Sequence, residues 1–412
     1  MNILISAYAV SPNHGSEPGV GWNWVIQLAK YCKVIVITES EFESEITLAL
    51  KSLPQRDNLV FKFISIGEKA RAMCWNQGDW RFYSYYRLWQ FKVYKMALDI
   101  VASQRIDLIH QLNMIGYREP GFLWKINTSY FVWGPVGGFN FVRFNYLVKL
   151  GWKGIIFYSI KNTLNYLQAR TSIRVKRAAK RANLVLAAST QMSNELMRFY
   201  NKPSIVMNET GCISVDAPVF KKNVEVSFNI LWVGRFIPTK MLNLALHTIS
   251  SVKDLTGLKF HIVGSGSNDT PINEAKQEAI DLGISNLCVW YGHVTQYDVQ
   301  TIMRNADLLF FPSIVEGTSH VVLESISNAL PVLCFDICGA GEVVTEEIGR
   351  KIPLTNPKES QALFAEQIRN LYSNRDLLTE MSISCHSRIH ALSWEQKGRQ
   401  LFSLYEELIK SK

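Results

Sequence analysis

Two carboxylates eight residues apart, Glu316 and Glu324, follow an apolar run in the C-terminal half of the chain. The run 306–312 is typical of a buried strand, and the apolar spacing of 323–330 predicts a helix packed on a sheet. Glu316 is therefore expected in the loop at the C-terminal edge of a strand, and Glu324 about two turns into the next helix. Open α/β sheets bind ligands at that edge, where helix N-termini also present unpaired N–H groups to anions. The pattern suits a phosphorylated ligand that has hydroxyl groups at both ends.

A second loop at a strand end supplies two cations, Arg235 and Lys240. The sequence Gly-Arg-Phe-Ile-Pro-Thr-Lys follows a predicted strand and opens a predicted helix. Two fixed cations at such a loop are what a diphosphate needs. A third strand, 258–263, is followed by Gly264 and Gly266, and glycine allows the backbone to come close to a ligand.

Together these features resemble the retaining glycosyltransferases of the large family 4, the glycosyl transferases group 1, whose members have the GT-B fold. Gly-Arg-x4-Lys, the later Gly-Ser-Gly and Glu-x7-Glu occur here in the order found in that family. The resemblance covers nearly the whole chain, most strongly from residue 228 onward. It implies transfer of a hexosyl group from a nucleotide-diphosphate sugar, without a cofactor or a metal ion. The chain contains no Asp-x-Asp sequence, which agrees with this expectation.

The resemblance also implies roles for the charged residues. Arg235 and Lys240 are expected to neutralise the diphosphate and to stabilise its departure, the work that a metal ion does elsewhere. Glu324 is expected to hold the ribose hydroxyls, and Glu316 to orient the sugar and stabilise an oxocarbenium-like centre. The leaving phosphate is expected to accept the proton of the acceptor, so no protein base is assigned.

The phosphate cradle is expected from the backbone of four consecutive residues, Gly317, Thr318, Ser319 and His320. The family often has Phe-Gly-Leu after Glu-Gly, whereas this chain has Thr-Ser-His. This departure leaves the identity of the donor sugar open.

A loop rich in glycine and proline follows the first predicted strand and contains Gly15, Ser16 and Glu17. The family has a Gly-rich loop here, whose backbone approaches the donor diphosphate and the acceptor. Gly15 and Ser16 are therefore assigned to donor binding and Glu17 to the acceptor side. A purely structural turn is the alternative.

His110 ends the predicted strand 108–111, where the family has a histidine that faces the donor sugar. It is expected to donate a hydrogen bond to the sugar, and a satisfied structural histidine is the alternative. Gly137 and Gly138 follow another predicted strand and resemble a motif found in a subset of these enzymes. They are assigned to the acceptor side of the site.

The whole chain alternates strands with helices, which predicts largely parallel, doubly wound sheets. The expected fold class is α/β, with two Rossmann-like domains that face each other across a cleft. Residues 1–215 are expected to form the acceptor domain and 216–393 the nucleotide-sugar donor domain. By resemblance, a last helix within 394–412 crosses back to the N-terminal domain. The expected strands are 3–7, 34–38, 60–66, 108–111, 130–133, 184–188, 204–207, 230–233, 260–263, 287–291, 308–312 and 331–335.

Charge is distributed unevenly along the chain, whose net charge is +9. Residues 120–194 contain no Asp or Glu but eleven Lys and Arg, and Arg174, Arg177 and Arg181 recur at helical spacing. The region 139–182 is therefore predicted to bind an anionic membrane surface. Nucleic acid would suit the same charge, and also the nine aromatic residues between 75 and 94, but no nucleic-acid motif accompanies them. Nucleic acid is therefore not expected as a partner.

The expected location is the cytoplasm, on the inner face of the cell membrane. No apolar run approaches the roughly 18 residues that span a bilayer, and the N-terminus lacks the pattern of a secretion signal. Seven scattered cysteines indicate thiols in a reducing compartment.

The most favoured function is a retaining glycosyltransferase that acts on a lipid-linked or polysaccharide acceptor in the synthesis of cell-envelope glycans. A non-hydrolysing nucleotide-sugar epimerase and a catalytically silent nucleotide-sugar-binding protein remain as alternatives.

Overall fold

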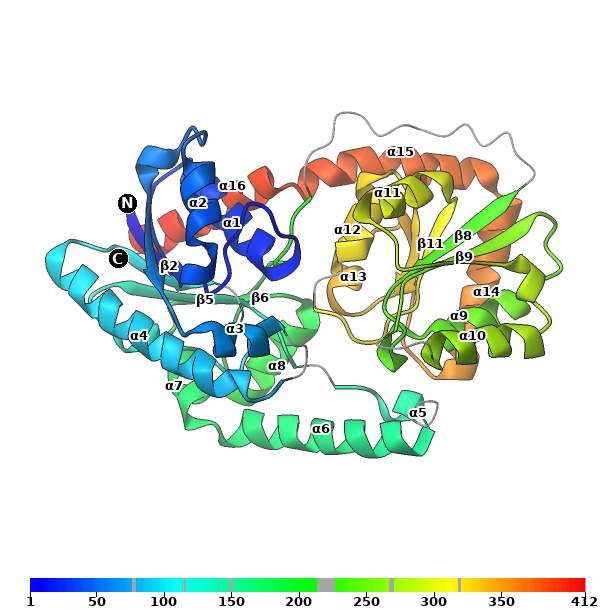
Figure 1. Cartoon of the computed structure of the whole chain (residues 1–412), viewed down its shortest axis with the longest axis horizontal. Helices are drawn as coiled ribbons and strands as arrows, with labels where there is room; N and C mark the ends of the chain where they lie inside the picture. Colours follow the sequence, from blue (N-terminus) through cyan, green and yellow to red (C-terminus); the bar gives the residue numbers. More distant parts are fainter. Residues whose placement is uncertain are drawn as a thin grey trace. The chain divides into compact units, whose positions relative to one another are not determined.

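A computed structural model describes residues 1–75, 79–112, 114, 116–139, 141–147, 151–212, 227–266, 270–317 and 320–411. The chain forms two compact units (Figure 1). Unit 1 contains Met1–Phe139, Asn165–Gly211 and Trp394–Lys412, and unit 2 contains Asn140–Leu164 and Cys212–Ser393. The expected division differs at residues 140–164, which the sequence places in the N-terminal domain. They group with unit 2 because Val142, Tyr146 and Leu147 are buried in the same core as Phe335.

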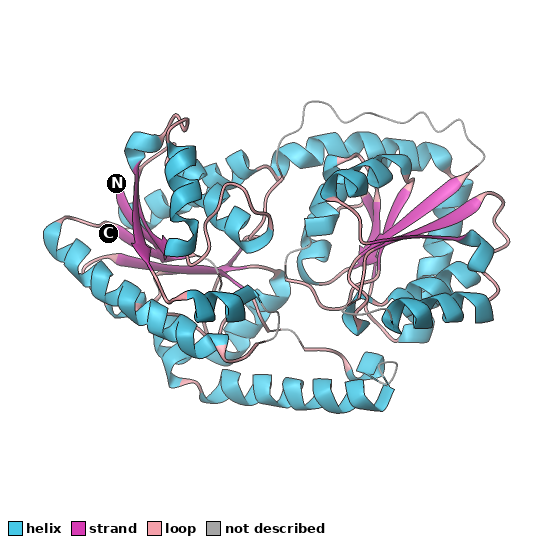
Figure 2. Ribbon diagram, viewed as in Figure 1, coloured by secondary structure: helices cyan, strands magenta, loops and turns pink. Residues whose placement is uncertain are grey.

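Unit 1 is built on a seven-stranded parallel sheet with the strand order β3-β2-β1-β4-β5-β6-β7. Its strands are β1 (Asn2–Ser6), β2 (Lys33–Glu39), β3 (Leu59–Ile64), β4 (Leu108–Gln111), β5 (Tyr130–Val136), β6 (Leu184–Ala187) and β7 (Ile205–Val206). Helices cover both faces of the sheet (Figure 2), so its central strands β1 and β4 are almost completely buried. The helices are α1 (Ser16–Leu28), α2 (Glu43–Leu50), α3 (Glu68–Trp75), α4 (Phe82–Ser103), α7 (Ile173–Arg181), α8 (Thr190–Tyr200) and α16 (Trp394–Lys410).

The last helix, α16, packs against α1 in unit 1. The indoles of Trp24 and Trp394 meet edge to face with ring centroids 5.5 Å apart, and Tyr31 stacks on Phe402 at 5.1 Å. Lys397 is buried and donates a hydrogen bond to the carbonyl oxygen of Asn208 at 2.5 Å. Aromatic packing and this buried hydrogen bond therefore hold the C-terminal helix to the N-terminal elements.

Unit 2 is built on a six-stranded parallel sheet with the order β10-β9-β8-β11-β12-β13. Its strands are β8 (Phe228–Val233), β9 (Leu258–Val263), β10 (Cys288–Gly292), β11 (Leu308–Phe311), β12 (Val332–Phe335) and β13 (Gly349–Ile352). Its helices are α5 (Phe144–Leu147), α9 (Leu242–Ser250), α10 (Thr270–Asp281), α11 (Gln296–Asn305), α12 (His320–Ser327), α13 (Cys338–Val343), α14 (Pro357–Ser373) and α15 (Arg375–Ala391). The helix α6 (Gly151–Thr171) begins in unit 2 and ends in unit 1.

All strands expected from the sequence are present, with bounds that differ by a few residues. The strand β13 was not expected, because Gly-Arg-Lys-Ile carries two charges and no apolar run. Its position at the edge of the sheet explains this composition, since Arg350 and Lys351 are only half-buried there.

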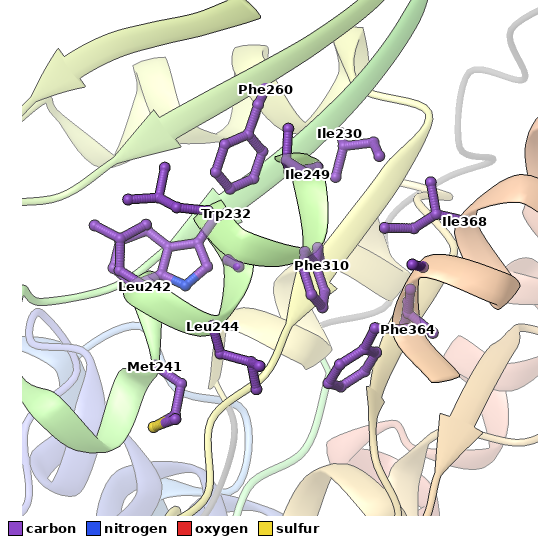
Figure 3. Packing of buried hydrophobic residues seen from close by; sticks show 14 of the residues in the cluster. Ile230, Trp232, Met241, Leu242, Leu244, Ile249, Phe260, Phe310, Phe364 and Ile368 are labelled. Carbon is purple, nitrogen blue, oxygen red and sulfur yellow. The ribbon is translucent and has the colours of Figure 1, made fainter. Parts of the chain in front are cut away.

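The sheet of unit 2 has a separate apolar core on each face. Ile230, Trp232 and Phe310 point to one face, whereas Leu231 and Leu309, their chain neighbours, belong to the cluster on the other. Figure 3 shows the first cluster, where side chains of the strands meet Ile249 of α9 and Phe364 of α14. The ring centroids of Phe310 and Phe364 are 4.8 Å apart. Burial on both faces fixes the strands, and with them the loops that leave their carboxyl ends.

Each sheet has one point at which the strand order reverses. In unit 1 it lies between β1 and β4, and in unit 2 between β8 and β11. The chain leaves neighbouring strands in opposite directions at such a point, which opens a crevice above their carboxyl ends.

Candidate active site

A cavity of about 510 Å³ opens at the carboxyl ends of the strands β10, β9, β8 and β11 in unit 2. It spans the point where the strand order reverses, as expected for a ligand site in a doubly wound sheet. Four loops line it together with Val299 and Val321, and each loop follows one of these strands. The lining residues of the loops are Val233, Gly234, Arg235, Ile237, Thr239, Lys240, Val263, Gly264, Ser265, Gly292, His293, Val294, Val315, Glu316 and Gly317.

The central feature of the cavity is an ion pair between Lys240 and Glu316. Lys240 ends the short 3-10 helix η5 (Pro238–Lys240) after β8, and Glu316 lies in the loop after β11. The two side chains are only 14% and 16% exposed. The ammonium of Lys240 also lies 5.2 Å from the ring centre of Phe311. Low exposure weakens solvent screening, so both charges act strongly on any ligand that enters the cavity.

Backbone hydrogen bonds join the loops around this pair. Gly264 donates to the carbonyl oxygen of Gly292 at 2.9 Å, and Phe236 donates to that of Ser265 at 3.0 Å. Ile314 donates to the carbonyl oxygen of Thr239 at 3.0 Å, which joins the loop of Lys240 to that of Glu316. The positions of the two charged residues are therefore set by the backbone.

Gly264 is required by the structure. It has a φ of +143°, and a Cβ atom at this position would lie 1.7 Å from the carbonyl oxygen of Gly234. Only glycine fits both the conformation and the space. The close approach seen here is to the neighbouring loop, and the expected approach of Gly264 to a ligand stays a prediction.

Arg235 lines the cavity two residues after β8, and its side chain is exposed. Lys240 and Arg235 place two cations on the loop after β8. Gly317 lines the cavity directly after Glu316. The sequence-predicted residues Arg235, Lys240, Gly264, Glu316 and Gly317 are therefore brought together in one site.

The first turn of α12 lies next to this group. His320 begins the helix, and burial together with the positive charge of Lys240 lowers the pKa of its imidazole. Glu324 lies one turn after His320, which is the first described residue of α12. Burial raises the pKa of Glu324, and its carboxylate accepts a hydrogen bond from Gln296 at 3.4 Å.

Three predicted donor-binding residues of unit 2 do not line the cavity among the residues described. His320, Glu324 and Gly266 lie outside its described lining, whereas Val321 belongs to it. Of the expected cradle, Thr318 and Ser319 lie outside the described residues. Contact of Thr318, Ser319 and His320 with a ligand stays a prediction.

Sequence reasoning missed one wall of the cavity, formed by Gly292 at the end of β10 and by His293 and Val294 after it. The signal was available, because Gly-His follows the predicted strand 287–291 as Gly-Arg follows the strand of β8. Gly292 has a φ of +68° and accepts the hydrogen bond from Gly264, so it belongs to the frame of the site.

The structure contradicts the expected role of His110. Its side chain is fully buried in unit 1 and both ring nitrogens have protein partners. Nε2 donates to the carbonyl oxygen of Gly134 at 2.6 Å, and Nδ1 accepts from the hydroxyl of Tyr405 at 2.5 Å. Burial lowers the pKa of His110 to about 4, so the ring is neutral near pH 7. Because no ring nitrogen is left for a sugar hydroxyl, His110 is a structural residue that joins β4 to β5 and α16.

The remaining predicted residues lie in two segments of unit 1, at the start of α1 and directly after β5. Gly15 is the N-cap of α1 and Ser16 begins that helix with a φ of +56°. Glu17 follows them, and burial together with the negative charge of Glu209 raises the pKa of its carboxyl group to about 8. A carboxyl group that is protonated near neutral pH can donate a hydrogen bond as well as accept one.

Gly137 and Gly138 follow β5 and pack against the loop after β4. Gly137 accepts a hydrogen bond from the backbone of Tyr117 at 3.0 Å. Gly138 has a φ of +97°, and a Cβ atom there would lie 3.3 Å from the Cα atom of Gly116. The glycine motif thus has a structural reason, and its acceptor role stays a prediction.

No three His, Cys, Asp or Glu side chains form a group that could hold a metal ion within the described ranges. The expectation of a reaction without a metal ion stays a prediction.

Comparison with known proteins identifies the family. Residues 219–385 match the family described as Glycosyl transferases group 1. An uncharacterised glycosyltransferase of Methanocaldococcus jannaschii is 23% identical over 316 residues, which cover 76% of this chain and 79% of that protein. The O-antigen chain mannosyltransferase B of Escherichia coli is 22% identical over 241 residues, 55% of this chain and 61% of that protein.

Among solved structures, HepE of Anabaena in complex with UDP superimposes with a TM-score of 0.62 at 15% sequence identity. The superposition covers 99% of this chain and 100% of that one. This similarity confirms the expected GT-B fold, with two Rossmann-like units. The sequence match bears out the expected resemblance: residues 219–385 match the glycosyl transferases group 1.

Proposed function

We propose that the chain is a retaining glycosyltransferase of family 4 that moves a hexosyl group from a nucleotide-diphosphate sugar to a lipid-linked or polysaccharide acceptor. The observation that carries this proposal is the Lys240–Glu316 ion pair in the cavity of unit 2. A pair of opposite charges suits the two ends of the bond that breaks, since the diphosphate gains negative charge and the sugar carbon gains positive charge. The UDP complex of HepE supports a nucleotide as the leaving group.

In this proposal Lys240 and Arg235 bind the diphosphate. The bond between the sugar C1 and the diphosphate oxygen breaks, and its electron pair goes to that oxygen. Fixed cations stabilise this charge without reorganisation, because the backbone already holds the loop of Lys240 in place. Glu316 stabilises the positive charge that develops at the sugar.

The acceptor hydroxyl oxygen forms the new bond to C1 on the face that the diphosphate leaves. Its proton passes to the departing phosphate, so the configuration at C1 is retained and no protein base is needed. Glu324 holds the ribose hydroxyls, and backbone amides at the start of α12 contact the phosphates. We assign neither a metal ion nor another cofactor to the reaction.

An envelope glycan is proposed as the product. The similarity to a protein named O-antigen chain mannosyltransferase B supports this part of the proposal. A lipid-linked or polysaccharide acceptor also agrees with the membrane surface proposed below.

The test is release of nucleoside diphosphate from a panel of UDP-, GDP- and ADP-sugars, with EDTA present and a lipid extract as acceptor. We expect release from one donor, and loss of this activity in Glu316→Ala. Glu347→Ala is the matched control, because it removes an exposed carboxylate of the same unit outside the cavity. Proton NMR of the sugar product gives its anomeric configuration, which must equal that of the donor.

Other outcomes separate the alternatives. Interconversion of two nucleotide-sugars without an acceptor would indicate an epimerase. Nucleotide binding without any turnover would indicate a catalytically silent binding protein. Equal activity in Glu316→Ala and wild type would refute the site. An inverted product would leave the donor site in place and refute the retaining mechanism.

A further inference from the structure

The helix α6 has apolar side chains on two opposite faces. One face packs on the protein, with Ile155 and Tyr158 against the core of unit 2 and Ala169 fully buried. The other face is exposed and carries residues at a spacing of three and four, which places them in one row along the helix. This apolar stripe consists of Trp152, Ile156, Phe157, Ile160, Leu164 and Leu167.

The exposure of the stripe is large. Trp152 is 69% exposed and Phe157 60%, while Ile156, Ile160 and Leu164 are each more than half exposed. A surface helix of a soluble domain normally turns polar residues to water and apolar residues to the core. A continuous exposed row of large apolar side chains indicates a surface that binds another protein, a membrane or a ligand.

The charges around the stripe identify the binding partner. Lys161 and Arg170 of α6 itself are exposed and lie on the two borders of the stripe. Because residues 120–194 contain no Asp or Glu, no negative charge from this region offsets these cations. Apolar side chains bordered by Lys and Arg, with Trp among them, are the composition of helices that lie at an anionic lipid surface.

A second copy of the chain fits this surface less well. In a symmetric dimer, equivalent patches face each other. The basic residues of both copies would then be brought together without acidic partners from the same region. Like charges at an interface oppose association, whereas anionic lipid headgroups neutralise the same cations.

Two of the three arginines that the sequence assigns to the membrane have other partners. Arg174 forms an ion pair with Glu119 at 2.6 Å and also donates to the backbone of Arg118. Arg181 donates to the carbonyl oxygens of Ile126 and Ser129. These two guanidinium groups stabilise unit 1, so the expectation that they form one basic surface with Arg177 is wrong for them.

We propose that α6 lies in the plane of an anionic membrane surface and inserts the apolar stripe among the lipid headgroups. Within the described ranges, no helix is long and apolar enough to cross a bilayer. The apolar stripe provides the insertion and the nearby lysines and arginines provide the attraction. This attachment would hold the enzyme where a lipid-linked acceptor is found, yet it does not depend on the proposed reaction.

Vesicle flotation of the full chain tests the proposal. The vesicles contain phosphatidylglycerol and phosphatidylethanolamine, or phosphatidylcholine alone. The test variant is Ile156→Ser with Ile160→Ser, at side chains that are 53% and 56% exposed. The matched control is Ile280→Ser with Ile383→Ser, which changes isoleucines of the same unit that are 56% and 52% exposed.

We expect wild type and control to float with the anionic vesicles, and the test variant to bind at least about tenfold more weakly. Binding to phosphatidylcholine vesicles, or in ~0.5 M salt, should be weaker for every protein because the lysines and arginines then contribute little. Failure of wild type to float, or equal loss in the test and control variants, would overturn the proposal. Light scattering provides the alternative outcome. If wild type and control were dimers that do not float, and the test variant were a monomer, the stripe would bind a second copy of the chain instead.

Donor turnover with water as acceptor is measured on the same proteins. We expect it to be unchanged in the test variant, because the substituted side chains lie outside the cavity. Loss of flotation with intact turnover therefore tests only the proposed membrane contact of α6. Absence of turnover with intact flotation would count against the proposed function and leave the membrane contact in place.

Discussion

Lys240 and Glu316 form an ion pair although they are 76 positions apart in the sequence. They meet because β8 and β11 are neighbours at the point where the strand order of unit 2 reverses. The loops after both strands are joined by the hydrogen bond from Ile314 to Thr239. Without a ligand, each charge stabilises the other, and a bound diphosphate sugar would offer each a new partner.

Lys240→Met should lower kcat for transfer by about 10²–10³-fold, the usual effect of removing one donor aimed at transition-state charge. KM for the donor should rise less, because Arg235 would still contact the diphosphate in the proposed site. The measurement is initial rates over a range of donor concentrations. Lys253→Met, at an exposed lysine of the same unit, is the control and should keep wild-type kinetics. Equal kcat values in the two variants would remove Lys240 from the proposed mechanism.

Gly264→Ala should destabilise unit 2 and abolish nucleotide binding. The new Cβ atom would lie 1.7 Å from the carbonyl oxygen of Gly234, at a φ that alanine rarely adopts. Gly292→Ala is a suitable comparison, since Gly292 also has a positive φ but no atom lies within 4 Å of its Cβ position. It should cost only the roughly 1–2 kcal/mol of a left-handed backbone. Urea unfolding of both variants gives the loss in the free energy of unfolding for each. A similar loss in both would show that the contact between the new Cβ atom and Gly234 is relieved by a small shift of the backbone.

His110 makes stability depend on pH. Its pKa is about 4 in the folded protein and its ordinary value is 6.5, so the unfolded chain binds a proton first as the pH falls. The stability is fully present above pH 6.5 and is lost progressively towards pH 4. Between pH 7 and pH 5 the loss should be about 2 kcal/mol, and His110→Gln should lack this part.

Urea unfolding of wild type and His110→Gln at both pH values gives the comparison. His110→Gln should also retain its kcat at pH 7 if it folds, since both ring nitrogens are bonded to the protein. A kcat that falls while stability and its pH dependence stay as in wild type would return His110 to the active site.

The sequence predicts the strands and the loops after them because these patterns are local. An apolar run that stops at Gly-Arg or at Pro-Ser marks the carboxyl end of a strand, and parallel strands bring such ends together. Arg235, Lys240 and Glu316 could be found in this way.

Side-chain partners that come from distant segments leave no such local pattern. Nothing near His110 indicates that Tyr405, 295 positions later, donates a hydrogen bond to its ring. Likewise, nothing near Arg174 indicates that Glu119 forms an ion pair with it. For the same reason the sequence misses α6, whose first part packs on unit 2 through Ile155 and Tyr158. Helical periodicity shows that a face is apolar but not whether protein or another surface covers it.

Glu17 should make stability depend on pH in the opposite direction to His110. Its carboxyl pKa is raised to about 8, first by burial and then by the charge of Glu209, whereas its ordinary value is 4.5. The folded protein therefore keeps a proton that the unfolded chain releases, so the stability from this group is present below pH 4.5 and declines as the pH rises towards 8. Glu17→Gln carries no titrating group and should gain stability over wild type as the pH rises from 5 to 8. Thermal unfolding across this range checks the trend, and a constant difference between the two proteins would mean that the Glu17 carboxyl group titrates normally.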